Sequence, residues 1–150
     1  MTLYHATCVA LHGRGIAIRG ASGAGKSALA LRLIHEGGAV LVADDQTRVE
    51  ASAGEAVASP PEILRGRIEA HGVGILSLPF AETARLAVVV DVAARDAIER
   101  LPEPDTVRLE GVELPRVSLD AADPAAVSKL CLAVTGRISD LEHDPIRKDR

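Results

Sequence analysis

The sequence has 150 residues, a formal net charge of −4 and only two aromatic side chains, Tyr4 and Phe80. This length suits one domain, and the acidic balance with few aromatic rings argues against a nucleic-acid surface, which needs basic patches or stacking platforms. There is no run of 18 apolar residues and no basic start followed by an apolar stretch, so we expect a single cytoplasmic domain over residues 1–150 that binds no membrane.

The first part of the chain predicts a β-hairpin. Two apolar runs, at residues 6–11 and 15–18, are joined by His12-Gly13-Arg14. Turn residues between short apolar runs are typical of two antiparallel strands. The second strand of this hairpin leads directly into a glycine-rich segment.

That segment matches G-x-x-x-x-G-K-[ST], the loop whose backbone N–H groups surround the phosphates of a nucleotide. Its expected nucleotide-binding residues are Gly20, Ala21, Ser22, Gly23, Ala24, Gly25, Lys26 and Ser27. In such a loop the lysine reaches the β- and γ-phosphates and the hydroxyl of the last residue ligates Mg²⁺. A helix over residues 28–34 follows, with a stop at Gly37-Gly38, and the first 35 residues contain no Asp or Glu. An anion site is expected to have such surroundings.

Two buried strands end in acidic residues. Residues 39–43 lead into Asp44-Asp45, and residues 86–90 lead into Asp91. A strand that delivers a carboxylate to the metal or the attacking group is typical of enzymes with this loop. We expect the strand before Asp44 to neighbour the loop strand in a parallel sheet. Asp91 is open to two interpretations, a metal-site residue or a strand end that caps a turn.

The middle of the chain predicts short strands and turns. Residues 46–67 alternate polar and apolar side chains around Pro60-Pro61, and residues 93–106 are a charged turn region. Residues 68–76 look like a buried strand, with a bulge at Gly72-Val73-Gly74 as the simplest account.

The last third predicts a hairpin and a helix. Strands are expected at residues 107–112 and 114–119, an amphipathic helix at 125–134 and a frayed tail at 139–150. Cys8 and Cys131 lie in apolar runs without paired spacing, so we expect two reduced, buried thiols.

Together these motifs resemble the HPr kinase/phosphorylase family, P-loop enzymes that phosphorylate a seryl hydroxyl of HPr, the phosphocarrier of the sugar phosphotransferase system. The resemblance covers about residues 5–119. His5 lies fifteen residues before Gly20, where the family has a catalytic histidine. Leu-Val-Ala-Asp-Asp at 41–45 matches the family, and Glu-Ala-His-Gly-Val-Gly-Ile at 69–75 is similar to its Glu-x-Arg-Gly-x-Gly-Ile signature. Glu-Arg-Leu at 99–101 is similar to its Asp-Arg-Leu.

The resemblance implies an α/β P-loop kinase domain with a mixed central sheet flanked by helices. It implies ATP on the loop, Mg²⁺ held by Ser27 and Glu69 with Asp44 as a metal or orienting partner, and Asp45 as the base. His5, Lys26 and Arg100 would offset charge on the transferring phosphoryl group. It further implies an HPr-like phosphocarrier as substrate, a homo-oligomer (a hexamer in the family) and a reverse phosphorylase reaction.

The sequence also departs from the family. Ala28 stands where a glutamate is usual, and His71 replaces the signature arginine. Residues 118–124 lack the Pro-Gly-Arg-Asn-type loop associated with dephosphorylation, and the usual N-terminal domain is not part of this sequence. We therefore expect a short form with the catalytic domain alone, and kinase rather than phosphorylase activity. Two alternatives are a nucleotide-binding sensor with weakened chemistry and a small-molecule P-loop kinase, although no arginine-rich lid is evident for the latter.

Overall fold

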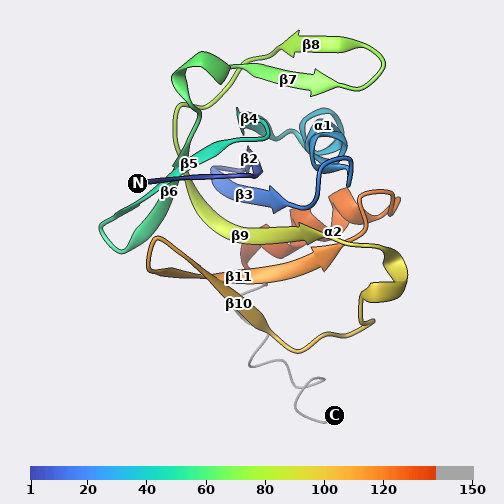
Figure 1. The fold of residues 1–150 in the computed structure, drawn as a ribbon. Helices are drawn as coiled ribbons and strands as arrows, with labels where there is room; N and C mark the ends of the chain where they lie inside the picture. Colours follow the sequence, from blue (N-terminus) through green and yellow to red (C-terminus); the bar gives the residue numbers. More distant parts are fainter. Residues whose placement is uncertain (138–150) are drawn as a thin grey trace.

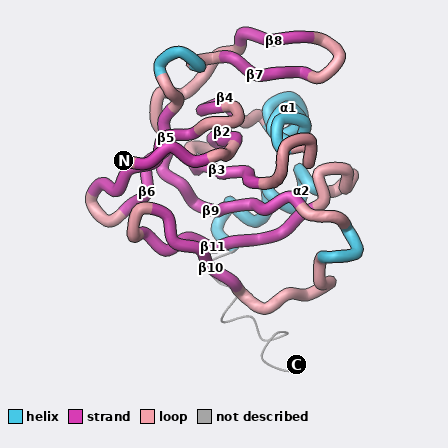
Figure 2. The backbone as a smooth tube through the Cα atoms, viewed as in Figure 1, coloured by secondary structure: helices cyan, strands magenta, loops and turns pink. Residues whose placement is uncertain are grey.

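The computed structural model describes residues 1–137. The protein is built around a mixed β-sheet (Figure 1; Figure 2). Within this range the sheet has nine strands: β1 (Thr2–Tyr4), β2 (Thr7–Leu11), β3 (Arg14–Arg19), β4 (Val40–Ala43), β5 (Thr47–Ser52), β6 (Glu55–Ser59), β9 (Ala84–Val92), β10 (Asp105–Leu109) and β11 (Val112–Leu119). A separate hairpin consists of β7 (Arg67–Ala70) and β8 (Gly74–Ser77).

Two α-helices accompany the strands, α1 (Lys26–Gly37) and α2 (Ala126–Leu132). Short turns of other helix types are η1 (Glu62–Leu64), η2 (Arg95–Ala97) and η3 (Ala133–Arg137). No helix in the described part of the chain is long and apolar enough to span a bilayer.

The sheet places the glycine-rich loop at the carboxyl ends of its central strands. β3 lies between β2, to which it is antiparallel, and β9, to which it is parallel, and β11 is parallel to β9 on the other side. The carboxyl ends of β3, β9 and β11 therefore meet at one edge of the sheet, which is where open α/β sheets bind ligands. The loop follows β3 at this edge and leads into α1.

The core has two layers of different composition. Ile16 and Ile18 of β3 face the layer that holds Leu29 and Leu33 of α1 and Leu130 of α2. The other side of the sheet is closed by strands and is rich in alanine and valine. No helical residue belongs to this second layer within residues 1–137. The expected α/β fold with a mixed sheet is confirmed, but the two helices share one face because the sheet curls over its other face.

Most expected elements are present. The hairpins at the start of the chain and around Gly111, and the helix after the loop, are confirmed. α1 ends as expected, with Gly38 at φ +75° donating its N–H to the carbonyl of Leu33. The expected helix at residues 125–134 is α2 followed by η3, and the expected tail at 139–150 lies outside the described residues.

The position expected for β4 was wrong. β4 pairs antiparallel with β2, so β2 lies between β4 and the loop strand β3. The parallel neighbour of β3 is β9 instead. The initial hairpin explains this order, because β2 folds back beside β3 and occupies the position that a simple β–α–β crossover would have filled.

The strand expected at residues 68–76 was also wrong. This segment is the hairpin β7–β8, with its turn at residues 71–73 and Gly72 at φ +85°. Val73 and Ile75 are 76% and 65% exposed, whereas Ile68 on β7 is buried in the core beside α1. The hairpin lies above the end of the sheet that carries the loop and α1 (Figure 1).

Candidate active site

The glycine-rich loop ends in an open helix N-terminus. Gly25 is the N-cap of α1 at φ +103°, and no side chain caps the helix there. The first turn carries no acidic residue. The first N–H groups of a helix have no intrahelical partner, and the helix dipole is positive at this end. The loop thus provides what a bound phosphate requires.

Lys26 lies inside the loop. It is only 6% exposed, and its Nζ donates to the carbonyls of Gly20 at 2.9 Å and Ala21 at 3.2 Å. These carbonyls satisfy a charged group that would otherwise be costly to bury. The ammonium is therefore held at the loop, beside the helix N-terminus.

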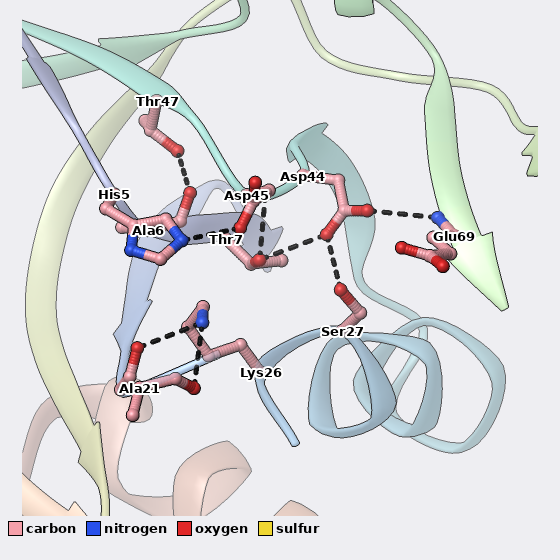
Figure 3. Close-up of polar contacts among 11 residues, drawn as sticks. His5, Ala6, Thr7, Ala21, Lys26, Ser27, Asp44, Asp45, Thr47 and Glu69 are labelled. Atoms are coloured by element: carbon pink, nitrogen blue, oxygen red, sulfur yellow. Dashed lines mark hydrogen bonds and ion pairs between the residues drawn. The ribbon is translucent and has the colours of Figure 1, made fainter. Parts of the chain in front are cut away.

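Asp44 collects three hydrogen-bond donors from three parts of the chain (Figure 3). Its Oδ1 accepts the hydroxyl of Ser27 at 2.6 Å and that of Thr7 at 3.0 Å. Its Oδ2 accepts the backbone N–H of Glu69 at 3.0 Å. α1, β2 and β7 thus meet at one buried carboxylate.

Asp45 projects from a tight turn after β4. Its φ is +66°, and the N–H of Gln46 donates to the carbonyl of Asp44 at 2.7 Å. The Asp45 N–H donates to Thr7 Oγ1 at 3.0 Å, and Oδ1 lies 2.7 Å from Nε2 of His5. The side chains of His5 and Asp45 are 53% and 60% exposed. Both side chains are therefore accessible to a molecule that approaches from solvent.

The backbone around His5 is held from a neighbouring strand. Thr47 at the start of β5 is fully buried, and its hydroxyl donates to the carbonyl of Ala6 at 2.8 Å. This contact fixes the short segment between His5 and Thr7. Figure 3 shows His5, Asp45, Asp44 and Ser27 together on the side of the sheet where the loop lies.

The structure brings together most of the residues expected at the site. His5, Ser27, Asp44, Asp45 and the backbone of Glu69 are joined by hydrogen bonds, and Figure 3 shows the Glu69 carboxylate beside Asp44 and Ser27. Lys26 is one residue before Ser27 at the start of the same helix.

Arg100 is not brought to this cluster. It is exposed in the segment between η2 and β10, and no hydrogen bond or ion pair seen within residues 1–137 joins it to the other expected site residues. In Figure 1 this segment leads from η2 towards β10 at the far end of the sheet from β7–β8.

Asp91 takes part in an ion-pair network. Its carboxylate accepts two hydrogen bonds from Arg19, at 2.8 and 3.0 Å, and a further one from Arg116. Burial raises the pKa of Asp91, but the hydrogen bonds from the two guanidinium groups outweigh it and hold the pKa below its ordinary value. Asp91 thus joins β3, β9 and β11, which neither interpretation of the sequence anticipated.

Two departures from the family pattern lie on the surface near this site. Ala28 is exposed on α1 directly after Ser27, and His71 is exposed in the turn of the β7–β8 hairpin. Within residues 1–137, neither side chain belongs to the hydrogen-bonded cluster around Asp44 and Asp45.

The third departure, the segment at residues 118–124, packs against the loop. Arg32 of α1 donates to the carbonyls of Ala121 at 3.1 Å, Asp123 at 2.9 Å and Pro124 at 3.2 Å. A Cβ placed on Gly25 would lie 2.8 Å from the Cβ of Ala121. The segment is therefore a fixed wall of the loop.

Thr7 is the functional candidate that sequence reasoning missed. It is fully buried and contacts both Asp44 and the Asp45 backbone. A hydroxyl in the otherwise apolar run at residues 6–11 was the available signal, because a buried polar side chain nearly always has partners.

Comparison with known proteins agrees with the family resemblance seen in the sequence motifs. The model of the HPr Serine kinase C-terminal domain family matches residues 1–135. The chain is 36% identical to an HPr kinase/phosphorylase of Bordetella pertussis, over 81% of this chain and 43% of that protein. It is 33% identical to an HPr kinase/phosphorylase of Streptococcus thermophilus, over 99% of this chain and 53% of that protein. The chain thus spans about half the length of these curated relatives.

A solved structure has the same fold. The HPr(Ser) kinase/phosphatase of Coxiella burnetii superposes with a TM-score of 0.79 at 19% identity, covering 90% of this chain and 96% of that one. Sequence, family match and architecture agree, and the chain belongs to the HPr serine kinase C-terminal domain family.

Proposed function

We propose that this protein is an ATP-dependent protein-serine kinase that phosphorylates an HPr-like phosphocarrier. The proposal is carried by one observation: two hydrogen-bonded pairs of side chains lie together at the edge of the sheet where the parallel strands end. One is the exposed His5–Asp45 pair, and the other is the Ser27–Asp44 contact at the start of the loop helix. The names of the relatives supply the substrate class.

Asp45 is the base in this proposal. Its carboxylate is accessible to a protein hydroxyl, and a general base must come within hydrogen-bond reach of the proton that it removes. Asp45 would accept the proton of the seryl hydroxyl as the oxygen attacks the γ-phosphorus. His5, 2.7 Å away, would orient the carboxylate and offset charge on the transferring group.

The residues present fit a magnesium ion. Mg²⁺ prefers oxygen ligands and is usually held by one or two protein oxygens together with phosphates and waters. Ser27, Asp44 and Glu69 offer a hydroxyl and two carboxylates. The described residues contain no group of three His, Cys, Asp or Glu side chains that could hold a metal ion. When bound, the ion would neutralise charge on the phosphate oxygens.

The Ser27 hydroxyl is already oriented for this role. It donates its proton to Asp44, so its lone pairs remain free for a cation. Asp44 therefore acts first as an orienting partner of Ser27. Lys26 and the N-terminal N–H groups of α1 would hold the β- and γ-phosphates.

The proposal is tested by transfer of labelled γ-phosphate from ATP to purified HPr in the presence of Mg²⁺. We expect label on a serine of HPr with the unaltered protein. We expect at least a roughly 10²-fold slower transfer with Asp45→Asn, because loss of a general base typically costs 10²- to 10⁴-fold.

The matched control is Glu50→Gln, which removes an exposed carboxylate on β5 and should transfer at the unaltered rate. ATP binding without any transfer to HPr would contradict the kinase proposal and favour a nucleotide-binding sensor. Equal rates for Asp45→Asn and the unaltered protein would remove Asp45 from the role of base.

A further inference from the structure

Thr7 is a buried hydroxyl between the two acids. β2 pairs with β4 through Cys8 and Ala43, which places Thr7 beside the Asp44-Asp45 turn. The side chain of Thr7 is fully buried. Its oxygen lies 3.0 Å from Asp44 Oδ1 and 3.0 Å from the backbone nitrogen of Asp45.

The direction of the two hydrogen bonds follows from their partners. A hydroxyl has one proton to donate and two lone pairs that accept. The backbone N–H of Asp45 can only donate, so Thr7 accepts from it and gives its own proton to Asp44. One oxygen thereby ties the side chain of one acid to the backbone of the next.

The Asp45 backbone needs such support. Its φ of +66° lies in the left-handed region, which residues with a side chain adopt rarely, although aspartate does so more often than most. Such a conformation persists when surrounding contacts determine it. In the described structure those contacts are the Thr7 hydroxyl on the Asp45 N–H, the short Gln46–Asp44 turn and the His5–Asp45 pair.

We propose that Thr7 is a positioning residue that fixes the relative placement of Asp44 and Asp45. The catalytic effect of this positioning rests on the proposed function, whereas the contacts of Thr7 with the two acids are independent of it. Thr7 reaches no substrate, because it is fully buried, and acts only through the two acids. Its hydroxyl, and not its methyl group, is the part that matters.

The experiment compares Thr7→Val with Thr7→Ser. Valine keeps the shape and removes the hydroxyl, whereas serine keeps the hydroxyl and removes the methyl group. We expect Thr7→Val to lower kcat for transfer to HPr by about 10- to 100-fold, since small misplacements of reacting groups cost this much. The KM for ATP should change less than kcat, because no hydrogen bond seen within residues 1–137 joins Thr7 directly to Lys26 or to the rest of the loop. Thr7→Ser should stay within about threefold of the unaltered protein in both constants.

A second measurement does not depend on activity. Amide hydrogen exchange reports whether the Asp45 N–H is still bonded. We expect exchange at Asp45 to be at least roughly tenfold faster in Thr7→Val than in the unaltered protein, and to be restored in Thr7→Ser. The Ala81 amide, which donates to the carbonyl of Leu41 in β4 at 2.8 Å, serves as an internal reference. If Thr7→Val does not fold, Thr7→Ala provides the variant without a hydroxyl.

Each outcome decides the proposal. Unchanged kcat and unchanged exchange in a folded Thr7→Val would overturn it. Equal losses in Thr7→Val and Thr7→Ser would also overturn it, because packing of the methyl group would then explain both. If even the unaltered protein transfers no phosphate to HPr, the proposed function fails, and exchange at Asp45 still decides whether Thr7 holds the acids.

Discussion

At the scale of single residues, Asp45 combines exposure with a constrained backbone. The side chain is 60% exposed, yet the main chain is held at φ +66° by its neighbours. Aspartate is one of the few residues with a Cβ that occur in this region with any frequency. A carboxylate carried on such a turn is presented to solvent without the freedom of a long loop.

In contrast to the exposed Asp45 carboxylate, the Cys8 thiol is made unreactive by burial. It is fully buried in β2, and burial raises the pKa of its thiol to about 12. The thiolate is the nucleophilic form of cysteine. We predict that a charged thiol reagent at pH 7 labels Cys131, which is half-buried, but not Cys8. Mass spectrometry of the labelled protein identifies the site.

The control for this labelling is the same reagent in denaturant, where both cysteines should react. Labelling of Cys8 in the native protein at a rate similar to that of Cys131 would show that β2 opens readily. The expectation that both thiols are buried is confirmed for Cys8, whereas Cys131 is only partly covered.

At the scale of elements, the loop depends on two kinds of glycine. Gly23 is at φ +79°, and a Cβ added to it would have no atom within 4 Å, whereas Gly25 is at φ +103° and its added Cβ would lie 2.8 Å from Ala121. Gly23→Ala should therefore cause strain only, and Gly25→Ala should cause strain and a clash with the wall at residues 118–124. We predict that Gly25→Ala weakens ATP binding at least roughly tenfold more than Gly23→Ala, as measured by titration calorimetry.

Gly13→Ala is the matched control, because Gly13 is at φ +77° in open space within the β2–β3 turn. Its effect on thermal unfolding measures the strain alone, and its ATP affinity should be unchanged. Equal affinity losses for the two loop variants would mean that the segment at residues 118–124 moves away without cost.

Local sequence patterns predicted the elements better than their arrangement. The loop, α1 and the stop at Gly38 were predictable because turn and cap residues act over a few positions. The β7–β8 hairpin was missed because Val73 and Ile75 are apolar but exposed, so the segment looked like one buried strand. The neighbour of β4 was missed because strand order depends on pairings between distant residues.

The candidate site was predictable to the same extent. The residues around Asp44 were expected from the motifs, since each motif is continuous in the chain. Thr7 was not expected, because its role depends on the register between β2 and β4. Arg100 remains a prediction, because no hydrogen bond or ion pair within residues 1–137 joins it to the other candidate site residues.

At the scale of the whole molecule, Asp91 joins the three parallel strands that end at the loop. Arg19 is on β3 and Arg116 is on β11, and both donate to this partly buried carboxylate on β9. We predict that Asp91→Asn lowers the free energy of unfolding by about 1–2 kcal/mol at pH 7, a value reduced for partial exposure to solvent. Urea unfolding measures the change.

This contribution should depend on pH in a defined direction. The pKa of Asp91 is lowered in the folded protein, so its stabilisation is complete above the unfolded pKa of about 3.9 and is lost as the pH falls through the folded pKa. The difference between Asp91→Asn and the unaltered protein should therefore shrink in acid. Glu55→Gln, which breaks an exposed pair with Arg85, should cost less than about 0.5 kcal/mol at pH 7. A constant difference down to about pH 2 would contradict the assignment.

The contacts of Asp44 also bear on when the site can form during folding. Its three donors are separated from it by 37, 17 and 25 positions along the chain, and they lie both before and after it. Contacts of this separation form against the loop-closure entropy of the intervening chain. A growing polypeptide would have to emerge beyond residue 69 before the carboxylate had all its partners. A chain that ended before β7 would therefore lack one of the three donors of the Asp44 carboxylate.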